Sequence, residues 1–179
     1  MRRKPAIDTR IAGIATRQHG VITLAQLEGV GLSSAGVTRR VQAGRLFRLH
    51  RAVYTVGHAA LAKEGRWMAA VLACGEAAVL SHRSAAELWA MLPPRDGPVD
   101  VTIASASGRS KRRGIRLHRC PLLPAAATAK RFGISVTTPA RTLADLSRTM
   151  RPWEVRRAAR QAAFDGLDLG HERGGDRTR

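Results

Sequence analysis

The stretch SSAGVTRRVQAGRLFRLHRAVYTV, residues Ser33 to Val56, carries two hydrophobic periodicities in succession. Val37 and Val41 lie four residues apart, which is the spacing of one helix face. A serine at 33 or 34 is typical of a helix N-cap, and Gly44 is typical of a helix end. From Phe47 onward, apolar and polar residues alternate and β-branched residues follow, which predicts a hairpin. We therefore expect a helix that passes directly into a β-hairpin.

Two shorter helical patterns precede this stretch. Ile7, Ile11 and Ile14 share one helix face and predict a helix over residues 8–18, with Asp8 as its N-cap. Thr23 and Gln26 have the spacing of a capping box at the start of a second, short helix. Helix, short helix, helix and hairpin are the plan of a winged helix-turn-helix.

The third helix has an inward and an outward face. At about 100° per residue, a stripe of Val37 and Val41 facing the first two helices leaves Ala35, Thr38, Arg39 and Gln42 on the opposite side. No acidic residue occurs between residues 29 and 62. Arginine and glutamine pair with base edges in the major groove, whereas phosphate contacts position the protein without reading sequence. The predicted base readers are Thr38, Arg39 and Gln42, and the predicted phosphate contacts are Ser33, Arg40, Arg45, Arg48 and Arg51.

A second unit is expected after a linker of small residues at 57–63. Helical patterns at its start and end flank strand-like segments such as PVDVTIAS and GIRLHRC. The fold class predicted is α+β: a winged helix-turn-helix domain at 1–57, followed by a small α+β domain at 63–168. Residues 169–179 are polar and rich in glycine, and we expect a disordered tail there.

The second unit has a basic segment of its own. Residues 101–144 contain no Asp or Glu, while one loop and the strand after it hold Arg109, Lys111, Arg112, Arg113 and Arg116. This surface could extend a DNA footprint, bind RNA or dock an acidic partner protein. A solvated loop between two strands is an equally good reading of the same charges.

The overall charge favours an anionic partner. The 179 residues carry a formal net charge of +18, and self-repulsion of that size is usually offset by a polyanion. A GC-rich coding sequence would explain the preference for arginine over lysine, but not the excess of bases over acids. Cys74 and Cys120 lack the paired spacing of a metal or redox site, and no stretch reads as a signal peptide or a membrane span. We expect a cytoplasmic protein without cofactor or metal.

Catalytic patterns are weak. A metal-dependent nuclease needs carboxylates close to a lysine, and here no Asp or Glu is followed two positions later by Lys. The six histidines are scattered, and none has a histidine partner at i, i+4. Ser81-His82-Arg83 looks reactive, but a lone histidine beside a cap serine is more often structural. We predict that the chain is not an enzyme.

Four segments resemble a known family: RQHGVITLAQLEGVGLS, RRVQAGRLFRLHRAVYTVG, EGRWMAAVLACGEAAVLSHRSAAELW and VTTPARTLADL. They are similar to AbiEi-like antitoxins of type IV toxin–antitoxin systems in actinobacteria. The resemblance implies a winged helix that binds the operator of an autorepressor, and an α+β unit that counters a nucleotidyltransferase-like toxin. Many such chains continue into a domain similar to very-short-patch-repair endonucleases, and this sequence ends before it.

Two positions depart from that family. The hairpin turn is Arg51-Ala52, where such proteins commonly have Arg-Gly, and a positive φ at alanine costs about 1 kcal/mol. Gly36 lies inside the reading helix, where it costs roughly 1 kcal/mol relative to alanine. The alanine suggests a different turn type at the wing tip, and either position suggests weaker DNA binding or a diverged copy of the family.

Three functions follow from these observations. The first is a DNA-binding, antitoxin-like transcriptional regulator that binds double-stranded DNA and represses its own operon. The second is the DNA-binding front half of an endonuclease-like protein whose catalytic domain is missing. The third is an interaction module that binds an acidic toxin, or the toxin's target, through the basic loop of the second unit. The operator, the oligomeric state and the toxin cannot be read from the chain.

Overall fold

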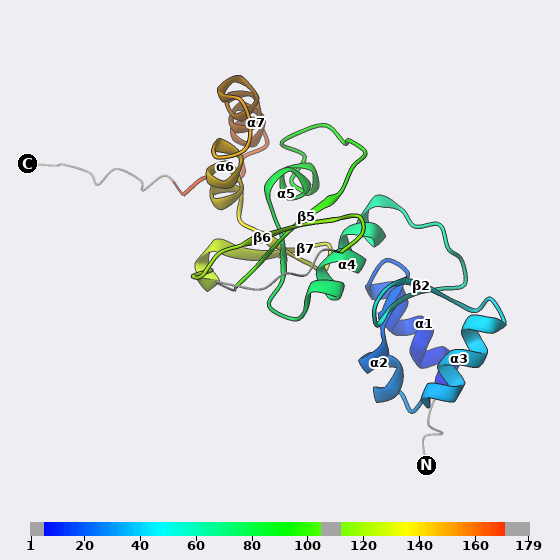
Figure 1. Cartoon of the computed structure of the whole chain (residues 1–179). Coiled ribbons are helices and arrows are strands. Elements are labelled where there is room, and N and C mark those ends of the chain that lie inside the picture. The colour runs from blue at the N-terminus through cyan, green and yellow to red at the C-terminus, as the bar shows by residue number, and fades with distance from the viewer. Residues whose placement is uncertain (1–5, 105–111, 171–179) are drawn as a thin grey trace, which may run out of the picture.

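The computed structural model describes residues 6–104 and 112–170 of the chain, and Figure 1 shows their arrangement. The protein is a mixed α+β structure with two sheets. Its N-terminal part is of the winged-helix type, with elements α1 (Ile7–Arg17), β1 (Val21–Thr23), α2 (Leu24–Gly29), α3 (Ser34–Gln42), β2 (Leu46–His50) and β3 (Val53–Val56). The predicted fold class is therefore confirmed.

Local signals account for most N-terminal boundaries. Thr23 and Gln26 form the predicted capping box at the start of α2, and Ser33 caps α3 by accepting a hydrogen bond from the Gly36 N–H at 3.2 Å. The N-cap prediction for Asp8 is wrong. Helix α1 begins one residue earlier, at Ile7, and the Asp8 carboxylate binds an arginine of α3 instead.

The first sheet has the strand order β1-β3-β2, and β1 was not expected from the sequence. Both faces of this sheet are buried, so apolar residues on each strand alternate between two cores. Ile22 and Tyr54 face a core formed with α1, α2 and α3, whereas Val21 and Val53 face the large core of the second unit. The face of the first sheet that points away from α1, α2 and α3 is thus covered by the second unit.

The element that covers it is α4 (Lys63–Cys74). This helix lies between the two sheets and contacts β1, β2 and β3 on one side and the five-stranded sheet on the other (Figure 1). Gly65 allows a close approach, since a Cβ at this position would stand 2.7 Å from the His19 carbonyl oxygen. Trp67, Met68 and Ala70 of α4 are almost fully buried, so one continuous core joins both units.

The second sheet has the strand order β6-β5-β4-β8-β7. Its pairs β4–β8 and β5–β6 are parallel, and β4–β5 and β7–β8 are antiparallel. Helices α5, α6 and α7 lie together beside it (Figure 1). They hold a third apolar cluster, whose buried members include Leu146, Ala158 and the nearby Met91. The bounds are β4 (Val79–Leu80), α5 (His82–Leu88), β5 (Val99–Ile103), β6 (Ile115–Arg119), the 3-10 turn Ala125–Ala127, β7 (Thr128–Arg131), β8 (Ile134–Thr137), α6 (Pro139–Ser147) and α7 (Pro152–Phe164).

One expected cap in this unit is not formed. The spacing of Ser84 and Glu87 predicts a capping box, but α5 already begins at His82. Ser84 Oγ accepts a hydrogen bond from the Asp100 N–H at 2.9 Å, and Glu87 forms ion pairs with Lys63 and Arg83. Tertiary contacts therefore replace the local cap. At the start of α6, in contrast, the local signals hold: Thr138 caps the helix by accepting a hydrogen bond from the Arg141 N–H, and Pro139 follows at the first helical position.

Candidate nucleic-acid interface

The buried face of α3 is narrower than the spacing of Val37 and Val41 predicts. Gly36 and Val37 are buried, but Val41 is 38% exposed, so the prediction that Val41 faces the core is wrong. A Cβ on Gly36 would stand 2.7 Å from Leu32 Cδ1. Because Gly36 has no side chain, α3 turns this side toward Leu32, and Val41 falls at the border of the packed face.

The opposite face of α3 is open to solvent. Ala35, Thr38, Arg39 and Gln42 are all exposed, as the sequence pattern predicts. The Thr38 hydroxyl donates to the Ser34 carbonyl oxygen at 3.1 Å, so its oxygen can still accept a hydrogen bond from another group. Arg39 and Gln42 thus present hydrogen-bonding groups of the kind that recognise base edges.

The hairpin follows α3 directly and carries its own exposed arginines. Arg45 precedes β2, Arg48 lies within β2 and Arg51 lies in the turn, and all three are exposed. Ala52 adopts the left-handed conformation, with φ of 60°. The turn therefore keeps a conformation that glycine favours, although alanine occupies it. A bulge between Arg48 and His50 shifts the strand register just before the tip.

Arg40 is a predicted phosphate contact whose guanidinium is already engaged by an acid. Its Nη2 lies 2.7 Å from Asp8 Oδ1, and its side chain is 21% exposed, against 68% for Asp8. The pair ties α3 to α1. Arg40 therefore has less charge available for DNA than Arg45, Arg48 and Arg51.

The second basic segment is only partly described. Arg109 and Lys111 lie outside the described residues, Arg113 is exposed, and Arg116 is 3.6 Å from Asp100. Arg112 is half-buried, and its Nε has no hydrogen-bond partner among residues 6–104 and 112–170.

Arg112 also acts on the wing. Burial, together with the positive charge of Arg112, lowers the pKa of His50 at the end of β2. This part of the second basic segment therefore lies near enough to the wing for the two to interact electrostatically.

A separate polar cluster surrounds the sequence Ser81-His82. Ser81 is fully buried, and its Oγ accepts a hydrogen bond from Thr102 at 2.8 Å and lies 3.0 Å from His82 Nδ1. The His82 and His118 rings stack with their centroids 3.6 Å apart, and His118 Nε2 lies 2.9 Å from Asp100 Oδ1. The Ser81 hydroxyl is therefore shielded from solvent and engaged by Thr102 and His82.

Burial is the main cause that lowers the pKa of His82, and the charge of His118 adds to it. The sequence offered no signal for the stacking, because His118 is on β6 and 36 residues away. Among residues 6–104 and 112–170, no three His, Cys, Asp or Glu side chains gather as a metal site would require. In the same ranges no helix has the length and apolar character needed to cross a bilayer.

The comparisons with known proteins agree with this geometry. Residues 10–57 match the family model described as transcriptional regulator, AbiEi antitoxin. The resemblance predicted from the sequence is confirmed for this part of the chain. No curated protein matches the sequence.

A solved structure is similar over nearly the whole chain. The crystal structure of the Rv2827c protein from Mycobacterium tuberculosis matches with a TM-score of 0.52 and 17% sequence identity. The alignment covers 94% of this chain and 74% of that one. At this identity the likeness concerns the fold alone.

Proposed function

Because residues 10–57 carry the AbiEi antitoxin type of transcriptional-regulator domain, we propose that the protein binds double-stranded DNA and represses its own operon within a type IV toxin–antitoxin system. The winged helix at 1–57 is the DNA-binding part in this proposal. The unit at 63–168 is the part that opposes a nucleotidyltransferase-like toxin, either directly or through the toxin's target, in the cytoplasm.

The exposed face of α3 is the observation that supports DNA binding best. Thr38, Arg39 and Gln42 project from a helix whose other side is fixed against the core through Gly36 and Val37. A helix of this kind fits the major groove, where its outward side chains reach base edges. We assign Thr38, Arg39 and Gln42 to base reading.

The arginines around α3 supply the contacts to phosphate in this proposal. Arg45, Arg48 and Arg51 are exposed on the segment that follows α3, and Ser33 caps the start of the helix. The Ser33 oxygen accepts from the Gly36 N–H, which leaves its hydroxyl proton free to donate to a phosphate oxygen. Arg40 belongs to the same group, with a smaller contribution because Asp8 competes for it.

The test compares one base reader with one phosphate contact. A random duplex library is selected with the wild-type protein, and the best sequence is then titrated against single-base variants. We expect Arg39→Ala to lose about 1–3 kcal/mol of discrimination at one base pair, because a bidentate contact to a base edge is lost. Arg48→Gln is expected to weaken all sequences to a similar degree.

Arg160→Gln is the matched control. Arg160 is an exposed arginine on α7, away from α3 and the hairpin, so its removal changes the net charge by the same amount. If Arg39→Ala and Arg48→Gln both weaken binding without changing base preference, α3 is not the reading helix. Repression is tested with the DNA upstream of the protein's own gene fused to a reporter, whose expression should rise with Arg39→Ala.

A further inference from the structure

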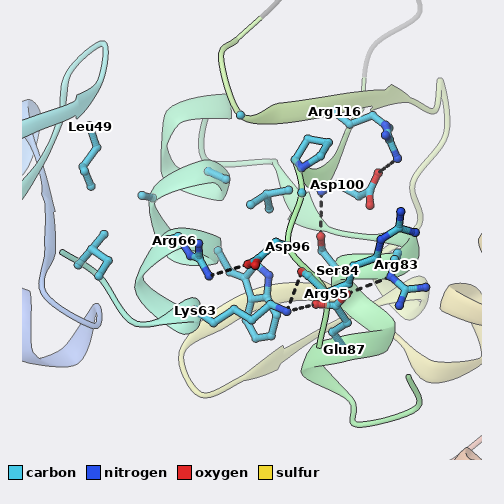
Figure 2. Close-up of a pocket in the computed structure, with 18 of the residues that line it drawn as sticks. Leu49, Lys63, Arg66, Arg83, Ser84, Glu87, Arg95, Asp96, Asp100 and Arg116 are labelled. Atoms are coloured by element: carbon cyan, nitrogen blue, oxygen red, sulfur yellow. Dashed lines mark hydrogen bonds and ion pairs between the residues drawn. The ribbon is translucent and has the colours of Figure 1, made fainter. Parts of the chain in front are cut away.

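A cavity of about 410 Å³ lies between the wing and the second unit (Figure 2). Its walls come from the end of β2, from α4 and α5, from residues 95–100 and from the start of β6. Pockets that hold small molecules usually have volumes of roughly 300–1,000 Å³. The cavity therefore has room for a small organic molecule rather than for a single ion or water.

One part of the wall is apolar. Leu49 of β2, Leu61 before α4 and Trp67 of α4 line the cavity, together with Ala69 and Ala70. Figure 2 shows Leu49 on the side of the N-terminal unit, with the charged residues around the other end. A ligand that fills this space would place an aromatic or branched apolar group against that wall.

The charged part of the wall has an excess of cations. Among the described residues, five cationic side chains and three carboxylates line the cavity. The cations are Lys63, Arg66, Arg83, Arg95 and Arg116, and the carboxylates are Glu87, Asp96 and Asp100. Glu87, whose side chain is 5% exposed, neutralises part of the charge of Lys63 and Arg83.

Two of the remaining arginines are available for a ligand. Arg66 Nη2 is 3.9 Å from Asp96 Oδ1, and the Asp96 side chain is 99% exposed, so water screens this pair strongly. Arg95 forms no ion pair within residues 6–104 and 112–170, and only its backbone carbonyl is used, as acceptor of a hydrogen bond from Lys63 Nζ at 3.1 Å. Arg66 and Arg95 therefore retain donors for an anionic group.

We propose that this cavity binds a small organic anion, with its phosphate or carboxylate on Arg66 and its apolar group against Leu49, Leu61 and Trp67, while Arg95 adds to the positive potential of the site. We expect a ligand in this cavity to regulate DNA binding, an inference that rests on the proposed function. Leu49 and His50 line the cavity and directly precede Arg51 at the wing tip. A bound anion lowers the positive potential beside the wing, so occupancy weakens the binding of DNA.

Phenyl phosphate is the probe for the binding site, since it combines an aromatic ring with a phosphate. Amide and indole NMR shifts of the full chain are followed as phenyl phosphate is added. We expect saturable shifts at Trp67, Leu49 and His50, a loss of affinity of at least 10-fold in Arg66→Gln/Arg95→Gln, and no change in Arg156→Gln/Arg160→Gln. Inorganic phosphate, which has no apolar group, is expected to bind at least 5-fold more weakly.

The site is refuted if the NMR signals of Trp67, Leu49 and His50 do not shift at about 10 mM phenyl phosphate, a concentration at which even weak organic ligands bind. It is also refuted if the double variant Arg66→Gln/Arg95→Gln binds as well as wild type. If inorganic phosphate binds as tightly as phenyl phosphate, the apolar wall does not contribute to binding, and that part of the proposal is wrong. Because Arg66 and Arg95 are exposed, we expect the double variant to fold like wild type, and its NMR spectrum checks this directly.

Coupling is tested separately, in a DNA titration with and without phenyl phosphate at matched ionic strength. Saturating phenyl phosphate is expected to weaken DNA binding by about 5-fold or more in wild type and to have no effect in Arg66→Gln/Arg95→Gln. An equal effect in that variant would mean competition at the DNA surface and would overturn the coupling. Wild-type protein that binds phenyl phosphate but no DNA would contradict the proposed function and leave the ligand site standing.

Discussion

Replacing Arg48 by glutamine is expected to reduce the salt dependence of DNA binding by a defined amount. Arg45, Arg48 and Arg51 are exposed and close no ion pair within residues 6–104 and 112–170, whereas Arg40 is held by Asp8 at 2.7 Å. Each phosphate that is neutralised contributes about −0.9 to the slope of log K against log salt. Three free arginines therefore predict a slope of about −2.7 for each bound protomer, and one fewer predicts about −1.8.

These slopes translate into measurable losses of affinity. Between 50 and 200 mM KCl, wild type should lose roughly 40-fold in affinity and Arg48→Gln roughly 12-fold. The assay is fluorescence anisotropy with one labelled duplex at four salt concentrations. Arg40→Gln should change the slope less than Arg48→Gln does, since Asp8 already offsets its charge.

The control for this experiment is Arg160→Gln, which removes an exposed charge from α7. Its slope should equal that of wild type. If Arg160→Gln lowers the slope as much as Arg48→Gln does, binding is spread over the whole basic surface and the assignment of phosphate contacts to the wing is wrong.

Three further changes test the structure itself. Gly65→Ala places a Cβ 2.7 Å from the His19 carbonyl oxygen and should lower the free energy of unfolding by about 1–3 kcal/mol in urea titrations, despite better helix propensity. Glu87→Gln leaves its two flanking cations without a buried partner and should cost about 2 kcal/mol, or roughly 4–8 °C in Tm by calorimetry. The lowered pKa of His82 means that the unfolded chain binds its proton more readily, so stability should fall as pH drops below about 6.5.

Each of these changes has a matched comparison. A Cβ at Gly13, in α1, meets Arg17 Nη1 at 3.8 Å and no other atom of the described part of the chain, so Gly13→Ala should raise stability by about 1 kcal/mol. A similar gain in Gly65→Ala would refute the close approach of α4. Glu76→Gln, at an exposed position, should leave Tm within about 1 °C. His82→Asn should reduce the loss of stability between pH 6.5 and 5.5, and an unchanged loss would assign it to other groups.

Local chemistry in the sequence determined the N-terminal elements. The Thr23–Gln26 capping box, the Ser33 cap and the alternation after Phe47 involve residues a few positions apart, so their interactions form in a short segment. The exposed positions of Thr38, Arg39 and Gln42 also follow from helix periodicity alone. The candidate DNA interface could be predicted from the chain for this reason.

The tertiary structure decided which faces are covered. In the first sheet β3 pairs with β2 and also with β1, whose partner residues lie 30 to 34 positions earlier in the chain, and α4 covers the other face of that sheet. Leu32 packing on Gly36 moves Val41 to the border of the core, and Asp8 binds Arg40 instead of capping α1.

The cavity between the wing and the second unit was also decided by the tertiary structure, because its lining residues come from several segments between Leu49 and Arg116. Contacts between residues this far apart in the sequence depend on how whole helices and strands pack. They cannot be predicted from a residue and its nearest neighbours along the chain. The sequence alone therefore determined the helices, the hairpin and the exposed reading face, while packing decided the buried second face of the wing, the ion pairs and the cavity.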